Sequence, residues 1–208
     1  MTPTTLVPAI GELERIYGLA VDLFPPSHAD ALAATRPVIL IQSRGRKEGT
    51  LGWHWPERWQ TGNTVFTEIV ITAESLNRPV EEIAETMIHE MVHHANALAG
   101  IADVSSNGVY HNTAFRDLAV ATGLTVERQG NRGLALTALT DQLREHIATE
   151  WDLDASAFAL FRRTEEKTTA SKGKQRLWKC DCGFSVRVAV DYFSAVCNDC
   201  GDPFTRRD

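Results

Sequence analysis

The chain has 208 residues, of which 43% are hydrophobic and 23% are charged, as expected for a soluble globular protein. No apolar run is long enough to span a membrane, and the first residues lack the pattern of a signal peptide, so we expect a cytoplasmic protein with no membrane partner. The formal net charge of −6 argues against a general coating of nucleic acid.

The first third of the chain is predicted to contain one helix and the first strands of a sheet. Apolar side chains recur at helical spacing over residues 9–23, and a Phe-Pro-Pro sequence at 24–26 then ends the helix. The aliphatic run at 38–41 indicates a strand. Residues 50–55 are predicted to return antiparallel to that strand, before a loop over 56–63.

Residues 65–72 form the third predicted strand, and two positions in the sheet remain open for it. As an edge strand beside a cleft, it would let an extended substrate pair with its main chain. As an inner strand, it would be paired on both sides. Three short strands ahead of a helix favour an α+β domain, in which helices pack on a small, mostly antiparallel sheet.

The strongest helical pattern lies at residues 79–100, where apolar side chains recur at three- and four-residue steps after a proline suited to the first turn. Four residues advance a helix by roughly 400°, so His89 and His93 project from nearly the same face and can share a zinc ion. Glu90 lies one residue along, where it can act as general base on a zinc-bound water. The alternative, two surface histidines on a solvated face, conflicts with the apolar flanking positions.

A catalytic zinc ion usually has three protein ligands and one open position. The candidates after His93 are His94, His111, Glu127 and His146. His94 is rotated by roughly 140° from His89 around the helix, so it faces elsewhere. His111 stands 18 residues after His93, beyond a predicted loop at 101–110 and just before a short predicted helix. The alternative for His111 is a helix-capping or surface histidine.

The rest of the chain is predicted to hold a further helix and then a linker. Residues 133–163 have leucines spaced along one helical face. Residues 164–177 are polar, which indicates a linker between domains at 1–163 and 178–208. Seven basic residues and two glutamates lie within 162–179, so this stretch is a candidate for contact with DNA, with a charged, solvated linker as the alternative. The candidate residues for that contact are Arg162, Arg163, Lys172, Lys174, Arg176 and Lys179.

The four cysteines form two close pairs, each followed by a glycine that suits a tight turn. In a cytosolic chain, such pairs favour metal over disulfides. We therefore predict a zinc ribbon over residues 178–208, in which four thiolates hold a structural zinc ion and stabilise a module too small to fold on its core alone. The alternative is four reduced cysteines without metal. The predicted ligands are Cys180, Cys182, Cys197 and Cys200.

In this order, the residues resemble the SprT-like (Spartan-type) metallopeptidase domain. The similarity rests on the HEMVHH sequence at 89–94, on His111 with Phe115 four residues later, on Leu-Gly-Trp at 51–53 and on EIVIT at 68–72. Many relatives also carry a C-terminal zinc ribbon.

The resemblance implies a zincin-like fold for residues 1–163, with Glu90 as catalytic acid and base. The ligands of the catalytic zinc ion that it implies are His89, His93 and His111. Asn112 stands where relatives usually have glycine. Spartan-type relatives act on proteins crosslinked to DNA, which implies a role in DNA repair.

The leading hypothesis is therefore a zinc-dependent endopeptidase. One alternative is a non-hydrolytic binding or adaptor module that zinc only braces. Glu90 argues against it, because a purely structural site has no use for that carboxylate. Another alternative is a regulatory peptidase that cleaves one specific repressor. Tyr110 and His94 are candidates for assisting the oxyanion, with a packing tyrosine and an exposed histidine as the alternatives.

Overall fold

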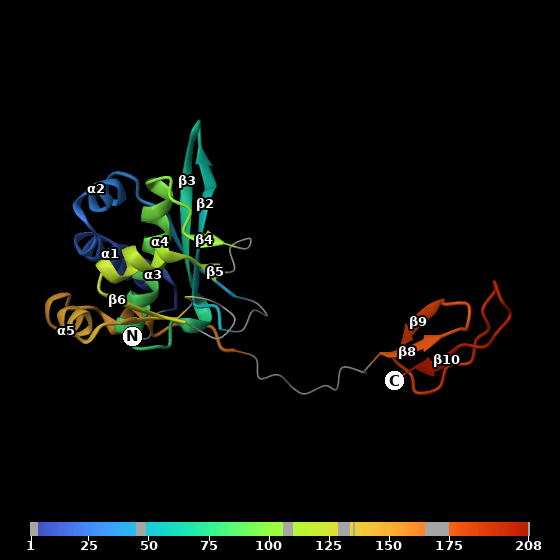
Figure 1. Cartoon of the computed structure of the whole chain (residues 1–208). Helices are drawn as coiled ribbons and strands as arrows, with labels where there is room; N and C mark the ends of the chain where they lie inside the picture. Colours follow the sequence, from blue (N-terminus) through green and yellow to red (C-terminus); the bar gives the residue numbers. More distant parts are fainter. Residues whose placement is uncertain are drawn as a thin grey trace. The chain divides into compact units, whose positions relative to one another are not determined.

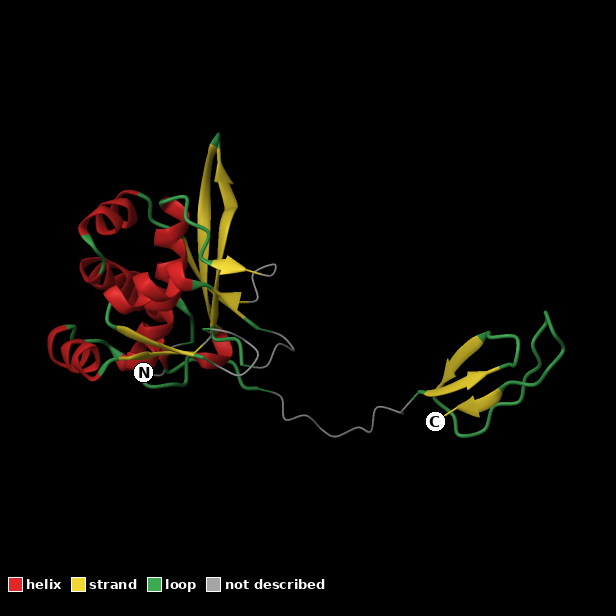
Figure 2. Cartoon of the chain, viewed as in Figure 1, coloured by secondary structure: helices red, strands yellow, loops and turns green. Residues whose placement is uncertain are grey.

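The structure is a computed structural model that describes residues 4–44, 49–105, 110–128, 134, 136–164 and 175–207 (Figure 1). The chain divides into two units, Met1–Thr164 and Glu165–Asp208. The first unit combines helices with small sheets in an α+β arrangement (Figure 2). Most of the predicted linker lies outside the described residues. Within the described ranges, no helix is both long enough and apolar enough to cross a membrane.

The first helix, α1 (Val7–Ala20), begins two residues before the predicted helix, and a 3-10 turn, η1 (Val21–Leu23), follows it. The second helix, α2 (Pro26–Ala34), is absent from the prediction. The Phe-Pro-Pro sequence does end the first helix, but its last proline also begins the next one, because the fixed φ and missing N–H of proline suit a first helical turn. The two helices are joined at Tyr17, whose hydroxyl donates to the carbonyl oxygen of Leu32 at 3.0 Å.

The main sheet has the strand order β1-β3-β2, with β1 at Val38–Gln42, β2 at Gly52–Thr61 and β3 at Thr64–Thr72. The central strand is β3, which is parallel to β1 and antiparallel to β2. The predicted pairing of the first two strands is therefore wrong, and so is the edge position considered for residues 65–72. Among the described strands, β1 and β2 form the two edges of this sheet.

Strand β2 is longer than predicted and includes most of the residues predicted as a loop at 56–63. The register of β2 against β3 shifts between Trp55 and Trp59, and Pro56 lies in this irregular stretch, which an edge strand tolerates because one side of its main chain lacks a partner strand. Gly62, with a φ of 56°, then turns the chain into β3. The end of this hairpin extends beyond the helices (Figure 1).

The two faces of the main sheet differ, because alternate residues of a strand point to opposite sides. One face belongs to the apolar core of the unit and carries Ile39, Ile69 and Ile71. On the other face, the indole N–H groups of Trp53 and Trp59 donate to the buried carboxylate of Glu68 at 3.3 and 2.9 Å. The core face is the one that meets the helices.

Helix α3 (Val80–Leu98) confirms the helix predicted at residues 79–100 to within two residues at each end. It packs against α1, α2 and the main sheet. Most of its apolar stripe is fully buried, as the helical period requires, including Ile83, Met87, Ile88 and Met91. His89, Glu90 and His93 therefore lie on a helix that packs against both the other helices and the main sheet.

After α3 the chain forms a hairpin and a short helix. Strand β4 (Val104–Ser105) pairs with β5 (Tyr110–His111), so part of the segment predicted as a loop at 101–110 forms strands. Helix α4 (Thr113–Ala121) confirms the predicted short helix. Asn112 is its N-cap, and its side-chain oxygen accepts from two backbone N–H groups of the first turn.

The predicted helix over 133–163 is wrong at its start and at its end. The described elements of this region are β6 (Leu124–Glu127), β7 (Leu136–Leu139), α5 (Asp141–Glu150) and η4 (Ala155–Phe158). The first leucines of the pattern lie in β7, because β6 offers an antiparallel partner for their main chain. Helix α5 begins only after Thr140, whose hydroxyl accepts from the N–H of Leu143.

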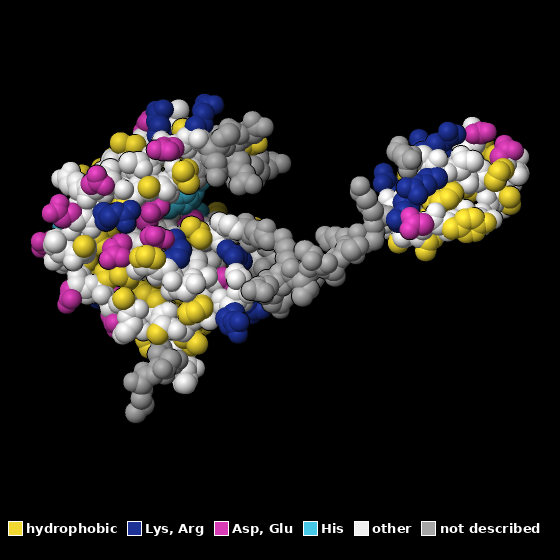
Figure 3. Space-filling view, turned by 90° about the horizontal axis from the view of Figure 1, so that it is seen from below, with side chains coloured by type: hydrophobic (Ala, Val, Ile, Leu, Met, Phe, Trp, Pro, Cys, Tyr) yellow, Lys and Arg dark blue, Asp and Glu magenta, His cyan; other side chains and the backbone are white. Residues whose placement is uncertain are grey.

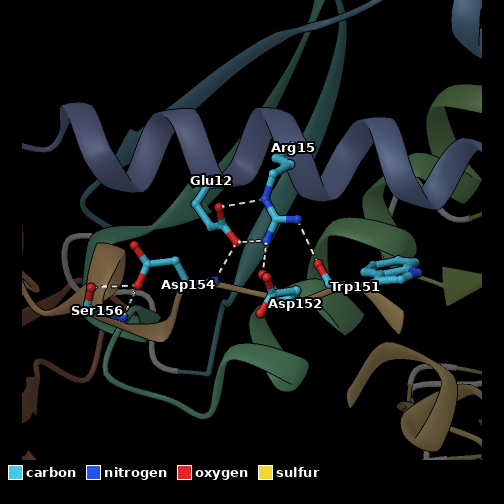
Figure 4. A network of polar contacts seen from close by, with 6 residues as sticks. All are labelled: Glu12, Arg15, Trp151, Asp152, Asp154 and Ser156. Atoms are coloured by element: carbon cyan, nitrogen blue, oxygen red, sulfur yellow. Dashed lines mark hydrogen bonds and ion pairs between the residues drawn. The ribbon is translucent and has the colours of Figure 1, made fainter. Parts of the chain in front are cut away.

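A polar network joins α1 to the segment after α5 (Figure 4). The guanidinium of Arg15 donates to the carbonyl oxygens of Trp151 and Asp152 at 2.7 and 2.6 Å. The carboxylate of Glu12 accepts from Arg15 and from the backbone N–H of Asp154, the latter at 2.9 Å. The network attaches the last segment of the first unit to its first helix.

The second unit contains a three-stranded antiparallel sheet in the order β10-β8-β9. Its strands are β8 (Arg176–Lys179), β9 (Ser185–Val188) and β10 (Thr205–Arg207). The rings of Trp178 and Phe193 pack edge to face at 5.7 Å, and Phe193 contacts Phe204 in the same way at 6.1 Å. The valines between the two cysteine pairs, at 186, 188 and 190, suggest a strand, and β9 includes the first two of them.

Candidate metal centre

Three histidines from two elements converge in the first unit. His89 and His93 are one turn apart on α3, and His111 is the last residue of β5, close to the start of α4. One ring nitrogen of each lies within 4.8 Å of the others, and Nε2 of His93 is 3.1 Å from Nε2 of His111. The structure thus brings the three predicted ligands into a group that could hold a metal ion.

The second ring nitrogen of each histidine contacts an oxygen atom. Nδ1 of His89, His93 and His111 lies 3.0, 2.8 and 3.0 Å, respectively, from oxygen atoms of Thr137, Asp103 and Leu134. A carboxylate and a backbone carbonyl only accept, so Nδ1 of His93 and of His111 donates, and the Nε2 atoms of these two rings face each other. At 3.1 Å the two Nε2 atoms can share a proton, as a hydrogen bond from His93, or a metal ion that both rings bind.

Electrostatics favour the neutral form of two of these rings. Burial, and then the charges of the neighbouring histidines, hold the pKa of His89 well below its usual value and lower the pKa of His111. Burial also acts to lower the pKa of His93, but the hydrogen bond to Asp103 and the charges of Glu90 and Asp103 outweigh burial and raise this pKa. A neutral imidazole is the form that binds a metal ion.

Phe115 forms the base of the histidine group. Its ring is fully buried and stacks on the ring of His111, with 4.0 Å between the centroids. The rings of His89 and His93 lie 4.8 and 4.7 Å from it. Close packing on an apolar ring restricts the orientations of all three imidazoles. All three histidines are partly exposed, and histidine side chains are visible in a recess of the surface (Figure 3).

Glu90 lies beside the histidine group on α3 and is almost completely buried. Burial raises the pKa of its carboxyl group to about 7, against the opposing effect of His93. The edge strand β2 comes so close that a Cβ atom added to Gly52 would lie 3.1 Å from Oε1 of Glu90. Glu90 therefore adjoins both the histidines and the main chain of the edge strand.

The other candidate residues do not join the histidine group in the described part of the chain. His94 is fully buried, so the exposed position considered for it is wrong, and its Nε2 atom lies 2.8 Å from the carbonyl oxygen of Thr35. Tyr110 is half-buried in β5. Glu127 and His146 belong to β6 and α5. The structure thus selects His111 among the four candidates.

His54 on β2 is a neighbour of the site that the sequence motifs do not single out. Its ring stacks on that of His93 with 6.1 Å between centroids and lies 5.7 Å from that of His94. Burial, and then the charges of His93 and His94, lowers the pKa of His54 to about 3. Residues 53–55 read Trp-His-Trp, and alternate side chains of a strand point to opposite faces of a sheet. This alternation could have predicted that His54 faces the helix if the two tryptophans face away from it.

The four cysteines also form a group that could hold a metal ion, in the second unit. They are Cys180, Cys182, Cys197 and Cys200, all free, with sulfur atoms within 4.8 Å of one another. Gly183 and Gly201 turn the chain after each pair with φ values of 99° and 78°. Their N–H groups donate to the carbonyl oxygens of Cys180 and Cys197 at 3.1 and 2.8 Å. The hydrogen bond after the first pair spans three residues, whereas the one after the second pair spans four.

The basic residues considered for contact with nucleic acid have different surroundings. The structure describes Arg162, Arg163, Arg176 and Lys179, whereas Lys172 and Lys174 lie outside the described residues. Arg162 pairs with Glu74 at 3.4 Å, and Arg176 pairs with Asp191. Arg163 and Lys179 are exposed. Two of the four described candidates are therefore engaged with carboxylates of the chain itself.

Comparisons of the chain with models of protein families, with curated proteins and with solved structures found no match. Function must therefore be inferred from the chemistry of the histidine group, of Glu90 and of the four cysteines.

Proposed function

We propose that the chain is a zinc-dependent endopeptidase of zincin-like fold, in which three histidines hold a catalytic zinc ion. The ligands are His89, His93 and His111. The proposal is carried by one observation: the Nε2 atoms of His93 and His111 lie 3.1 Å apart while both Nδ1 atoms face acceptors. Three imidazoles with an open side are a known ligand set for catalytic zinc. Zinc in such a site supplies a water of lowered pKa and polarises a carbonyl oxygen.

Glu90 is the proposed general base and general acid. With a pKa of about 7, its carboxylate can take a proton from water and return it to the leaving amine near neutral pH. A buried carboxyl group with such a pKa has no evident use in a site that only braces the fold. This counts against the non-hydrolytic adaptor.

The proposed substrate is an extended peptide that binds along β2. This strand is an edge of the main sheet among the described strands, and its main chain at Gly52 adjoins Glu90. A peptide that pairs with the free edge would gain main-chain hydrogen bonds whatever its sequence, with a peptide carbonyl near the carboxylate.

Two further parts of the proposal concern the ribbon and the substrates. The four cysteines would hold a second, structural zinc ion through their thiolates.

The proposed substrates are proteins bound or crosslinked to DNA, on the basis of the resemblance to Spartan-type domains. The alternative is that the chain is a regulatory peptidase that cleaves one repressor. Cleavage that single-stranded DNA does not stimulate at low salt would favour the alternative.

The variant Glu90→Gln tests the mechanism. The amide keeps the shape of the side chain but cannot take a proton, so we expect cleavage of casein to fall by at least about a hundredfold, with the zinc content retained. Glu127→Gln, on an exposed carboxylate of β6, is the matched control and should cleave as the wild type does. Cleavage by Glu90→Gln at the wild-type rate would remove the proposed mechanism.

A further inference from the structure

Asp103 lies in the connection between the two elements that carry the histidines. It follows α3 and directly precedes β4, and only 7% of its surface is exposed. Its side chain contacts α3, while its main chain contacts the segment that leads into α4. This position allows one residue to act on both parts of the ligand set.

The carboxylate of Asp103 is bonded to two side chains of α3. Its Oδ2 atom lies 2.8 Å from Nδ1 of His93 and 3.2 Å from Nδ2 of Asn96. Asn96 is also buried, with 2% of its surface exposed. A buried carboxylate requires such donors, because desolvation penalises an unpaired charge.

The main chain at Asp103 is bonded to the start of α4. The carbonyl oxygen of Asp103 accepts from the backbone N–H of Asn112 at 2.9 Å, and that of Ala102 accepts from the side-chain amide of Asn112 at 2.8 Å. Asn112 follows His111 directly and caps α4. Asp103 therefore connects the ring of His93 to the backbone beside His111.

The other two histidines have neutral partners. A threonine hydroxyl and a backbone carbonyl lie at Nδ1 of His89 and His111, whereas the partner of His93 is a carboxylate. A charged acceptor holds an imidazole in the tautomer that leaves Nε2 free and makes the ring a stronger donor to a metal ion. This electronic effect falls on His93 alone among the three.

We propose that Asp103 is a positioning residue for the histidine site, which sets the orientation and donor strength of His93 and couples it to the placement of His111. The inference rests on the proposed function, because it requires a metal ion at the three histidines. Asp103 acts through His93 and does not touch the substrate. Loss of its charge should therefore weaken metal binding even where its hydrogen bonds persist.

The variant Asp103→Asn separates charge from shape, because the asparagine Oδ1 atom can still accept from His93 and Asn96. We expect the Kd of the histidine-site zinc to rise about tenfold to a hundredfold. This Kd is measured on the full chain by competition with a chelator. The variant His89→Ala identifies the histidine-site zinc, because that zinc is the one that the variant should fail to bind. Subtracting the visible absorption spectrum of cobalt-loaded His89→Ala leaves the contribution of the histidine site. This difference spectrum should also change in Asp103→Asn.

Two further variants sharpen the test. Asp117→Asn makes the same change at an exposed position on α4 and should leave the Kd unchanged. Asp103→Glu keeps the charge and should bind zinc more tightly than Asp103→Asn. Should Asp103→Asn fail to fold by circular dichroism, Asp103→Ser takes its place in the same comparison.

Either of two measured Kd values would overturn the inference. One is a wild-type Kd in the uncharged variant, and another is a Kd for Asp103→Glu that is no lower than that of the uncharged variant. A purely structural role would lower the unfolding temperature of the metal-free protein but leave the Kd and the cobalt spectrum unchanged. Absence of the histidine-site zinc from the wild type would overturn the proposed function itself, and the role of Asp103 with it.

Discussion

Gly52 is the residue at which the edge strand comes closest to Glu90. A Cβ atom there would lie 2.8 Å from the carbonyl oxygen of Val70 and 3.1 Å from both Glu90 Oε1 and Thr86 Cγ2. The shortest of these contacts is with a main-chain atom of β3, so the backbone of β2 or β3 must shift to relieve it. The absence of a side chain at Gly52 therefore allows the strand to close on the carboxylate.

Gly52→Ala is expected to lower the free energy of unfolding by about 1–3 kcal/mol, as overpacking of a core does. It should also reduce cleavage of casein by about tenfold or more, because the strand or Glu90 must move. Urea unfolding and the cleavage assay measure the two effects. Gly18→Ala on α1 is the matched control, since a Cβ there meets nothing within 4 Å. Similar behaviour of the two variants would contradict the steric explanation.

At the scale of elements, Glu12 and Arg15 attach α1 to the segment after α5. Glu12→Ala would leave the backbone N–H of Asp154 and the guanidinium of Arg15 without their shared acceptor. We expect a loss of about 2 kcal/mol in the free energy of unfolding, with activity unchanged well below the unfolding temperature, because the network lies apart from the histidines. Thermal and urea unfolding measure this loss.

The control for this prediction is Arg116→Ala. Arg116 pairs with its neighbour Asp117 on the surface, and an exposed ion pair contributes little to stability. If Glu12→Ala unfolds at the same urea concentration as Arg116→Ala, the network does not hold the segment in place.

Pairing between strands is the feature of the elements that local sequence predicted least well. The leucine spacing at 136–139 fits a helix and also a short strand, and only the presence of β6 decides between them. In the local sequence, Pro56 argues against a strand. In the structure, an irregular stretch of the edge strand β2 accommodates it. A strand depends on a partner that is distant in the chain, so composition alone leaves such segments open.

At the scale of the whole molecule, the two groups of residues that could hold a metal ion belong to different units. Elemental analysis of protein purified without chelator should therefore find two zinc equivalents per chain. His89→Ala should lose one of them and keep its four thiols protected from a thiol reagent, whereas a strong chelator should expose all four. A single equivalent that disappears when the cysteines are replaced would leave the histidine site without its metal.

The helical period by itself determined that His89, Glu90 and His93 lie within one turn of a buried helix, because helix geometry relates residues a few positions apart. The spacing of the cysteines likewise predicted that the two pairs form one group. Only the tertiary structure decided between His111 and the other candidate ligands, made β2 rather than β3 an edge strand, and brought Asp103 to His93. Contacts between segments distant in the chain depend on how the whole core packs, which no local pattern contains.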